Sequence, residues 1–188
     1  VEVRLPGGEW LPAPSAAAGK AVSAWLGRPV RVEPPPPAES RNYAMSFNIE
    51  DESVDAFEWF CPPGTFYDLA EMHVLTTASL RAAAGRYPEG AWVVDRFRPT
   101  VLVDAEGDDF VEDAWVGRRL RLGVAAEVVV DKPTIRCPMT TRAQGALARD
   151  LDILRTVNRE HDGNLGVYAS MVAGGEVGVG DEVVLLPA

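Results

Sequence analysis

Residues 117–130, GRRLRLGVAAEVVV, contain two strand-like runs separated by a short break. The runs cover residues 120–124 and 127–130 and are rich in the branched apolar side chains that favour β-structure. Residues 131–133, DKP, are expected to separate them from the segment at 134–141. Further short runs bounded by turn residues lie at 1–5, 73–75, 101–104 and 183–186. Helical spacing or capping signals occur at residues 16–26, 80–84 and 146–159. These patterns predict a mainly β fold with accessory helices, as a barrel or sandwich.

Composition excludes several classes of protein. The chain has 188 residues, a net charge of −10 and a pI of about 4.7, which disfavours binding to nucleic-acid phosphates. No run approaches the ~18 apolar residues of a membrane span. Two cysteines, Cys61 and Cys137, indicate reduced thiols and a cytoplasmic protein rather than a disulfide scaffold. The sequence starts on a strand-like run without Met, so we expect a fragment or a processed form.

Two regions are predicted along the chain. Residues 1–64 form a lead-in with a strand, a helix, a proline-rich spacer at 34–37 and a segment rich in aromatic residues. Residues 65–188 contain most of the expected strands and form the core domain.

Cys137 is the first candidate for a reactive residue. It follows Arg136 and precedes the hydroxyls of Thr140 and Thr141. A neighbouring guanidinium stabilises a thiolate, the form of cysteine that attacks electrophiles and binds soft metals. The alternative is a buried cysteine that acts as a small apolar side chain.

Two other motifs predict an anion site. Arg96 and Arg98 are two residues apart, so in an extended segment both would project from one face and suit a phosphate. Residues 76–79, TTAS, place hydroxyls where a helix begins, and helix N-termini bind anions. The alternatives are ion pairs of the arginines with surface acids and ordinary helix capping by the hydroxyls. With only two histidines and no GxGxxG or phosphate-loop motif, His-rich metal sites and common nucleotide-binding folds are disfavoured.

Six runs in sequence order resemble the MOSC domain, named for the C-terminal part of molybdenum cofactor sulfurases. They are residues 73–80 (HVLTTASL), 96–100 (RFRPT), 112–115 (EDAW), 136–141 (RCPMTT), 166–169 (GVYA) and 175–181 (GEVGVGD). The resemblance covers about residues 65–187 and implies a MOSC-type β-barrel.

The resemblance also implies site residues. In the amidoxime-reducing branch of the family a cysteine binds the molybdenum of a pterin cofactor, molybdopterin, and this role falls on Cys137. The positions that match the family's cofactor-binding residues are Thr76, Thr77, Ser79, Arg98, Thr100, Arg136 and Tyr168. That branch carries Asp at the position of Thr77 and Asn at the position of Thr100.

Three functions remain open at this stage. The first is a molybdenum-dependent oxidoreductase that reduces N-hydroxylated or related N–O substrates and receives electrons from a separate protein. The second is a sulfur carrier or sulfurtransferase that uses a Cys137 persulfide. The third is a non-catalytic module that binds the cofactor. In each case the partners are the pterin or a small substrate, not nucleic acid or a membrane.

Overall fold

The computed structural model describes residues 1–34, 37, 42–46, 48, 50–51, 53–60 and 69–187. Contacts divide the chain into two compact units, Val1–Arg41 and Asn42–Ala188. The boundary predicted between residues 64 and 65 lies outside the described residues, as do Cys61 and, in the proline-rich spacer, Pro35 and Pro36. No helix in the described part of the chain is long and apolar enough to cross a membrane.

The first unit is a short hairpin followed by one helix. Strands β1 (Glu2–Val3) and β2 (Leu11–Pro12) pair antiparallel and precede helix α1 (Ala16–Leu26). The Ser15 side chain accepts a hydrogen bond from the backbone N–H of Ala18, and Gly27 ends the helix in the left-handed conformation. The predicted helix at 16–26 is therefore confirmed, with both of its end signals.

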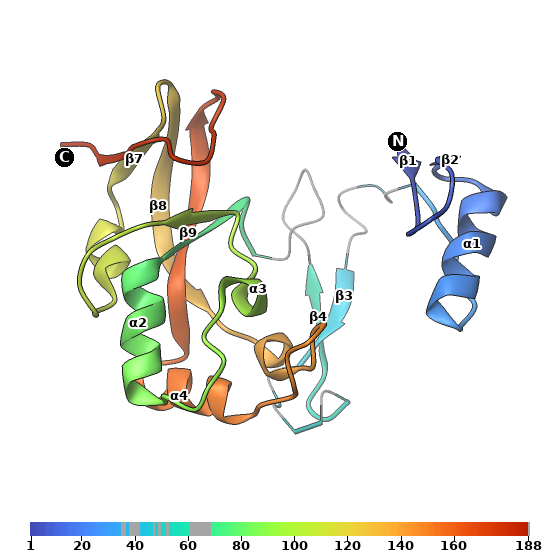
Figure 1. The fold of residues 1–188 in the computed structure, drawn as a ribbon, viewed down its shortest axis with the longest axis horizontal. Helices are drawn as coiled ribbons and strands as arrows, with labels where there is room; N and C mark the ends of the chain where they lie inside the picture. Colours follow the sequence, from blue (N-terminus) through green and yellow to red (C-terminus); the bar gives the residue numbers. More distant parts are fainter. Residues whose placement is uncertain are drawn as a thin grey trace. The chain divides into compact units, whose positions relative to one another are not determined.

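The second unit is built on a curled six-stranded sheet (Figure 1). Its strand order is β10-β7-β8-β9-β5-β6, and all neighbours are antiparallel except the parallel pair β5–β6. The strands are β5 (Met72–Thr76), β6 (Val101–Val103), β7 (Arg119–Leu122), β8 (Ala126–Ile135), β9 (Asn164–Ala173) and β10 (Val183–Leu185). A separate hairpin joins β3 (Asn42–Met45) to β4 (Phe57–Phe60). The prediction of a mainly β fold is confirmed.

The remaining elements are short helices of the second unit. The α-helices are α2 (Thr77–Arg86), α3 (Val94–Phe97) and α4 (Asp152–Glu160). Two 3₁₀ helices lie at Val111–Trp115 (η2) and Pro138–Thr141 (η3). Residues 146–151, predicted as part of a helix at 146–159, are not helical, and the helix begins only at Asp152.

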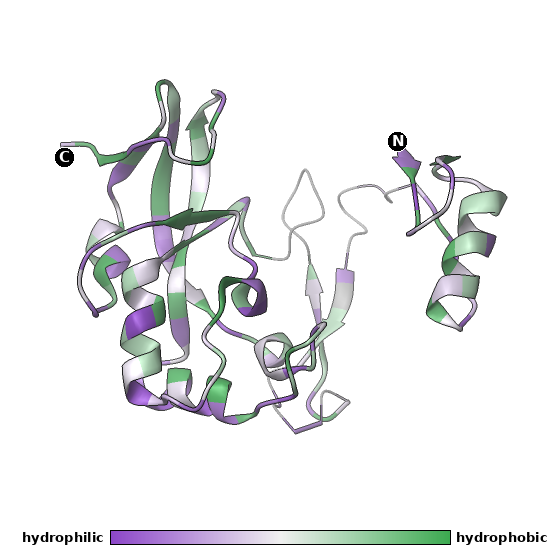
Figure 2. Ribbon diagram, viewed as in Figure 1, coloured by the Kyte–Doolittle hydropathy of each residue, from purple (hydrophilic) through white to green (hydrophobic). Residues whose placement is uncertain are grey.

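Both faces of the sheet are covered. Val74 and Leu75 are consecutive residues of β5, so their side chains point to opposite faces, yet both are fully buried. Val74 packs with Leu120, Val128 and other strand residues in one core, whereas Leu75 packs with residues of α2, α3 and α4 in a second core. Figure 2 shows hydrophobic segments along β8 and β9 and a hydrophilic patch on α2.

Strand β8 is longer than the sequence predicted. Residues 131–133 were expected to separate two segments, but the strand continues through them to Ile135. Its pairing with β9 shifts register on both sides of this stretch, between Val130 and Lys132 and between Pro133 and Ile135. Bulges of this kind accommodate a proline within a strand. The extension carries the chain directly to Arg136 and Cys137.

Candidate functional site

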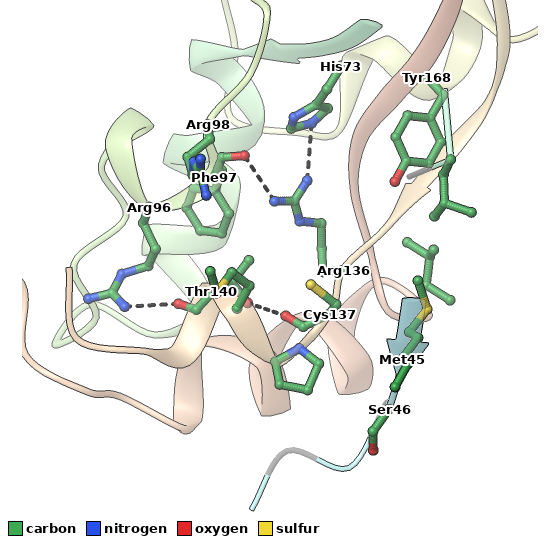
Figure 3. Close-up of a pocket in the computed structure, with 15 residues that line it drawn as sticks. Met45, Ser46, His73, Arg96, Phe97, Arg98, Arg136, Cys137, Thr140 and Tyr168 are labelled. Atoms are coloured by element: carbon green, nitrogen blue, oxygen red, sulfur yellow. Dashed lines mark hydrogen bonds between the residues drawn. The ribbon is translucent and has the colours of Figure 1, made fainter. Parts of the chain in front are cut away.

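A cavity of about 430 Å³ opens at the end of β8 in the second unit (Figure 3). It is bordered by β3, β5, α3, β9 and the segment that follows β8. Its lining residues include Met45, Ser46, His73, Arg98, Arg136, Cys137, Met139 and Tyr168. A cavity of this size falls in the range of small-molecule sites, roughly 300–1,000 Å³.

Cys137 is half-buried, and its sulfur atom points into this cavity (Figure 3). The segment around it is fixed by the backbone. The Cys137 carbonyl accepts hydrogen bonds from the backbone N–H of Thr140 at 3.2 Å and from its hydroxyl at 3.0 Å. Pro138 starts the η3 turn, where a missing N–H costs nothing. The thiol therefore sits on a rigid turn between a sheet strand and a 3₁₀ helix.

Arg96 and Arg98 do not share one face, and the expectation of an extended segment is wrong. Arg96 belongs to α3, whereas Arg98 ends that helix in the left-handed conformation, with φ of 53°. This reversal buries the first side chain and leaves the second exposed at the cavity. The two arginines therefore have different surroundings and different roles.

The guanidinium of Arg96 donates its hydrogen bonds to backbone carbonyls. It is 2% exposed and donates to the carbonyls of Ala91 at 3.1 Å, Thr140 at 2.9 Å and Ala148 at 3.2 Å. No acid accepts from it among the described residues, which excludes the ion pair considered from the sequence. Arg96 thus fastens α3 to the turn that carries Cys137 and to the loop after it.

Arg136 lies between α3 and β5. One of its terminal nitrogens, Nη2, donates to the Phe97 carbonyl at 3.0 Å, and the other, Nη1, lies 3.3 Å from Nε2 of His73 (Figure 3). The guanidinium carbon is 5.6 Å from the centre of the Phe97 ring, within the range of a cation–π contact. Arg136 therefore brings a fixed positive charge to the cavity wall beside Cys137.

His73 is a buried histidine that borders the same cavity. Its pKa is lowered from 6.5 to about 3, mainly by burial and to a smaller extent by the positive charge of Arg136. Hydrogen bonding to the Leu165 and Phe97 carbonyls acts in the opposite direction without outweighing these causes. The imidazole is therefore neutral at physiological pH.

Tyr168 comes from β9, next to His73 in the sheet register. Its ring is in edge contact with the imidazole, with 6.4 Å between the ring centres, and it lines the cavity. Four residues predicted from the sequence thus meet in one cavity: Cys137, Arg98, Arg136 and Tyr168.

Thr76 and Ser79 lie elsewhere, fully buried at the start of α2. Both hydroxyls donate to Oε2 of Glu112, Thr76 at 2.7 Å and Ser79 at 2.6 Å. The Thr76 hydroxyl also accepts from the backbone N–H of Ser79 and so caps the helix. Glu112 is itself fully buried in η2, so a carboxylate of the chain occupies the N-terminus of α2.

The other two predicted hydroxyls also bind within the chain. Thr77 donates to the side chain of Asp104 at 2.8 Å and accepts from the backbone N–H of Ala105. The Thr100 hydroxyl accepts from the backbone N–H of His73 at 3.1 Å, which extends the pairing of β5 with β6 by one residue. Neither side chain lines the cavity around Cys137.

Sequence reasoning missed His73 and the residues of β3 as parts of the cavity. His73 is buried, but its place in the HVLTTASL run was a signal that it accompanies the site. Ala44, Met45 and Ser46 reach the cavity through tertiary contacts, and no local pattern marks them.

The cavity contains one thiol but no protein metal cluster. Within the described part of the chain, no three His, Cys, Asp or Glu side chains come together in a way that would hold a metal ion. Arg98 and Arg136 line the cavity together with the buried Arg96, and its described lining residues include no carboxylate. This donor set suits an anionic small molecule, and a metal would need further ligands from such a molecule.

Comparison with known proteins agrees with this geometry. Residues 64–184 match the sequence pattern of the MOSC domain. The chain belongs to the MOSC domain family. The curled sheet and few helices described above are consistent with the β-barrel of MOSC proteins.

Two curated relatives of this MOSC chain come from Aedes aegypti. "Molybdenum cofactor sulfurase 3" and "Molybdenum cofactor sulfurase 1" are each 30% identical to it over 135 residues. Each match covers 65% of this chain but only 17% of the relative. The likeness therefore concerns one part of much larger proteins and connects this domain with the molybdenum cofactor.

Proposed function

We propose that the cavity binds the molybdenum cofactor, with Cys137 as the protein ligand of molybdenum. The observation that carries this proposal is the meeting of a half-buried thiol with Arg98 and Arg136 in one cavity. No acid is present among the described residues that line it. A positive cavity in a chain with net charge −10 attracts an anionic ligand toward the thiol.

The residues present fit such a cofactor. Arg98 is exposed to the cavity, and its planar guanidinium can bind a phosphate through two parallel hydrogen bonds. Arg136 adds a second guanidinium to the cavity wall, and its fixed charge favours an anion in the same space. The ring of Tyr168 borders this space and offers a polar contact to the pterin.

We further propose that the protein is an oxidoreductase acting on N-hydroxylated or related N–O substrates, as in the amidoxime-reducing branch. When bound, the cofactor supplies the redox chemistry, while the chain positions it and controls access. Cys137 is held on the η3 turn, so the thiol is fixed before the ligand arrives. Electrons would come from a separate donor protein.

The proposal is tested by metal analysis of the native full-length protein, purified from a host that makes the cofactor. We expect molybdenum and pterin to co-purify with it. Replacing the exposed arginine (Arg98→Gln) should lower the pterin content, whereas Arg155→Gln, an exchange on the exposed surface of α4, should leave it unchanged. Absence of molybdenum from the native protein would overturn the proposal.

Sulfur transfer is the second candidate, favoured by the names of the two relatives and by the accessible thiol of Cys137. The Cys137 thiolate would take the outer sulfur of a donor persulfide and release the donor as a thiolate. Mass spectrometry of the Cys137 peptide after exposure to a persulfide donor should then show one added sulfur atom. The third function, a binding module, predicts a different result. Cys137→Ser would then retain full cofactor binding, and the parent protein would show neither N–O reduction nor sulfur transfer.

A further inference from the structure

We infer that His73 is a positioning residue, which holds the guanidinium of Arg136 at the cavity wall through a lone pair on Nε2. The inference deepens the proposed function. It rests on that function only in taking the molybdenum cofactor as the anion that Arg136 binds. Its basis is the 3.3 Å contact between Nη1 of Arg136 and Nε2 of His73, which is partly buried beside the cavity (Figure 3).

The chemistry of the two groups fixes the direction of this contact. A guanidinium can only donate hydrogen bonds, so Nε2 must accept and cannot carry a proton. The backbone carbonyl of Leu165 also lies 3.3 Å from Nε2, and a carbonyl can only accept. The two neighbours therefore require opposite tautomers of the imidazole. We assign the proton to Nδ1, because the hydrogen bond from the charged guanidinium is the stronger of the two.

The position of the imidazole is itself constrained on several sides. Gly166 of β9 adopts φ of +83°, and a Cβ at this position would collide with Nε2 of His73. The ring of Tyr168 contacts the imidazole edge-to-face, and the backbone of His73 is bound to Thr100 in both directions. A ring held this firmly offers Arg136 an acceptor at a fixed position.

The fixed acceptors of Arg136 include the Phe97 carbonyl from α3 and His73 from β5. These acceptors come from two elements that are separated in sequence by the whole of α2. The position of the guanidinium therefore depends on how α3 and β5 lie relative to each other. Loss of the His73 acceptor would remove one of these two hydrogen bonds and allow the guanidinium to rotate away from Cys137.

The tautomer is tested directly by nitrogen NMR of the full chain at neutral pH. The chain has only two histidines, so His73→Gln assigns the signals. We expect the Nε2 of His73 to show the shift of an unprotonated nitrogen and Nδ1 that of a protonated one. The reverse pattern would overturn the inference, and this measurement needs no bound cofactor.

The positioning role is tested by alkylation of Cys137 with iodoacetate and with iodoacetamide, followed at the Cys137 peptide by mass spectrometry. Iodoacetate is an anion and iodoacetamide is neutral, so the ratio of the iodoacetate rate to the iodoacetamide rate rises with the positive charge near the thiol. We expect His73→Leu to lower this ratio by about ten-fold, equivalent to about 1.4 kcal/mol. His73→Gln should retain most of it, because the amide oxygen still accepts from Arg136.

A double variant separates positioning from a general loss of structure. If His73 acts through Arg136, then His73→Leu added to Arg136→Met should lower the ratio no further than Arg136→Met alone. Additive effects, or an unchanged ratio in His73→Leu, would contradict the inference. The rates are measured on the full chain from a host that does not make the cofactor, so the Cys137 thiol is free to react. Failure of the proposed function would appear instead as missing molybdenum in protein from a host that makes the cofactor.

Discussion

The hydroxyl of Thr76 donates a 2.7 Å hydrogen bond to the carboxylate of Glu112, and both residues are fully buried. Ser79 donates to the same oxygen. A negative charge at the N-terminus of α2 is favourable, because the helix dipole is positive there. The carboxylate of Glu112 thus lies where the sequence predicted an anion from outside the chain, and it ties η2 to α2.

This arrangement predicts that Thr76 contributes mainly to stability. Thr76→Val removes the helix cap and one hydrogen bond to a buried carboxylate, so the free energy of unfolding should fall by about 2 kcal/mol. Thr77→Val is the matched control, because the bond of Thr77 to Asp104 is exposed and should cost less than about 1 kcal/mol. Urea denaturation measures both. Pyrophosphate serves as a probe of anion binding at Arg98 and Arg136 in the cavity. Its affinity, measured by calorimetry, should not change in either variant, and a loss of affinity without a loss of stability would contradict the prediction.

Arg96 and Arg98 should separate stability from ligand binding. Arg96→Met leaves several buried carbonyls without their donor, so we expect a loss of about 3 kcal/mol in the free energy of unfolding. Lysine should not restore it, because one ammonium cannot reach carbonyls on three segments. Arg98→Met should stay within about 0.5 kcal/mol of the parent, as exposed substitutions usually do, yet weaken pyrophosphate binding. Equal stabilities for the two variants would show that the hydrogen bonds of Arg96 to these carbonyls do not stabilise the fold.

The different outcomes for elements predicted from the sequence have physical causes. Helix α1 was predicted at its observed bounds because Ser15 and Gly27 act on their own neighbours in the chain. The helix predicted from residue 146 starts later, because the carbonyl of Ala148 is taken by Arg96 and Gln144 pairs with Leu147. Such contacts depend on tertiary structure and leave no local signal.

The same distinction applies to the site. The Arg136–Cys137 pair is adjacent in sequence, and the structure places both at the cavity. The divergence of Arg96 from Arg98 depends instead on a left-handed residue that is not glycine, a conformation that sequence patterns rarely reveal. The contact of His73 with Arg136 joins residues 63 positions apart and follows only from the pairing of β5, β9 and β8.

Gly166 should tolerate no side chain. Its φ is +83°, and a Cβ added there would lie 2.7 Å from the Val74 carbonyl oxygen, so Gly166→Ala must displace β5 or β9. We expect a loss of more than about 3 kcal/mol in the free energy of unfolding. Gly107→Ala is the control, because Gly107 has a similar φ of +89° with open space around it, so only backbone strain of about 1 kcal/mol remains. Thermal and urea unfolding would reveal whether the two variants differ in this way.

His73 should make stability depend on pH. Its pKa is about 3 in the folded protein and 6.5 when exposed, so between these values the unfolded chain binds a proton that the folded chain does not. The free energy of unfolding should therefore fall as pH decreases from 6.5 towards 3, by about 1.4 kcal/mol per pH unit from this residue. Two ionisable side chains face the imidazole, the charged guanidinium of Arg136 and the phenol of Tyr168. His73→Gln should remove this part of the slope, as measured by urea denaturation at each pH. Arg136→Met should retain most of it, because burial is the larger cause of the shift, and equal slopes for His73→Gln and the parent would contradict the argument.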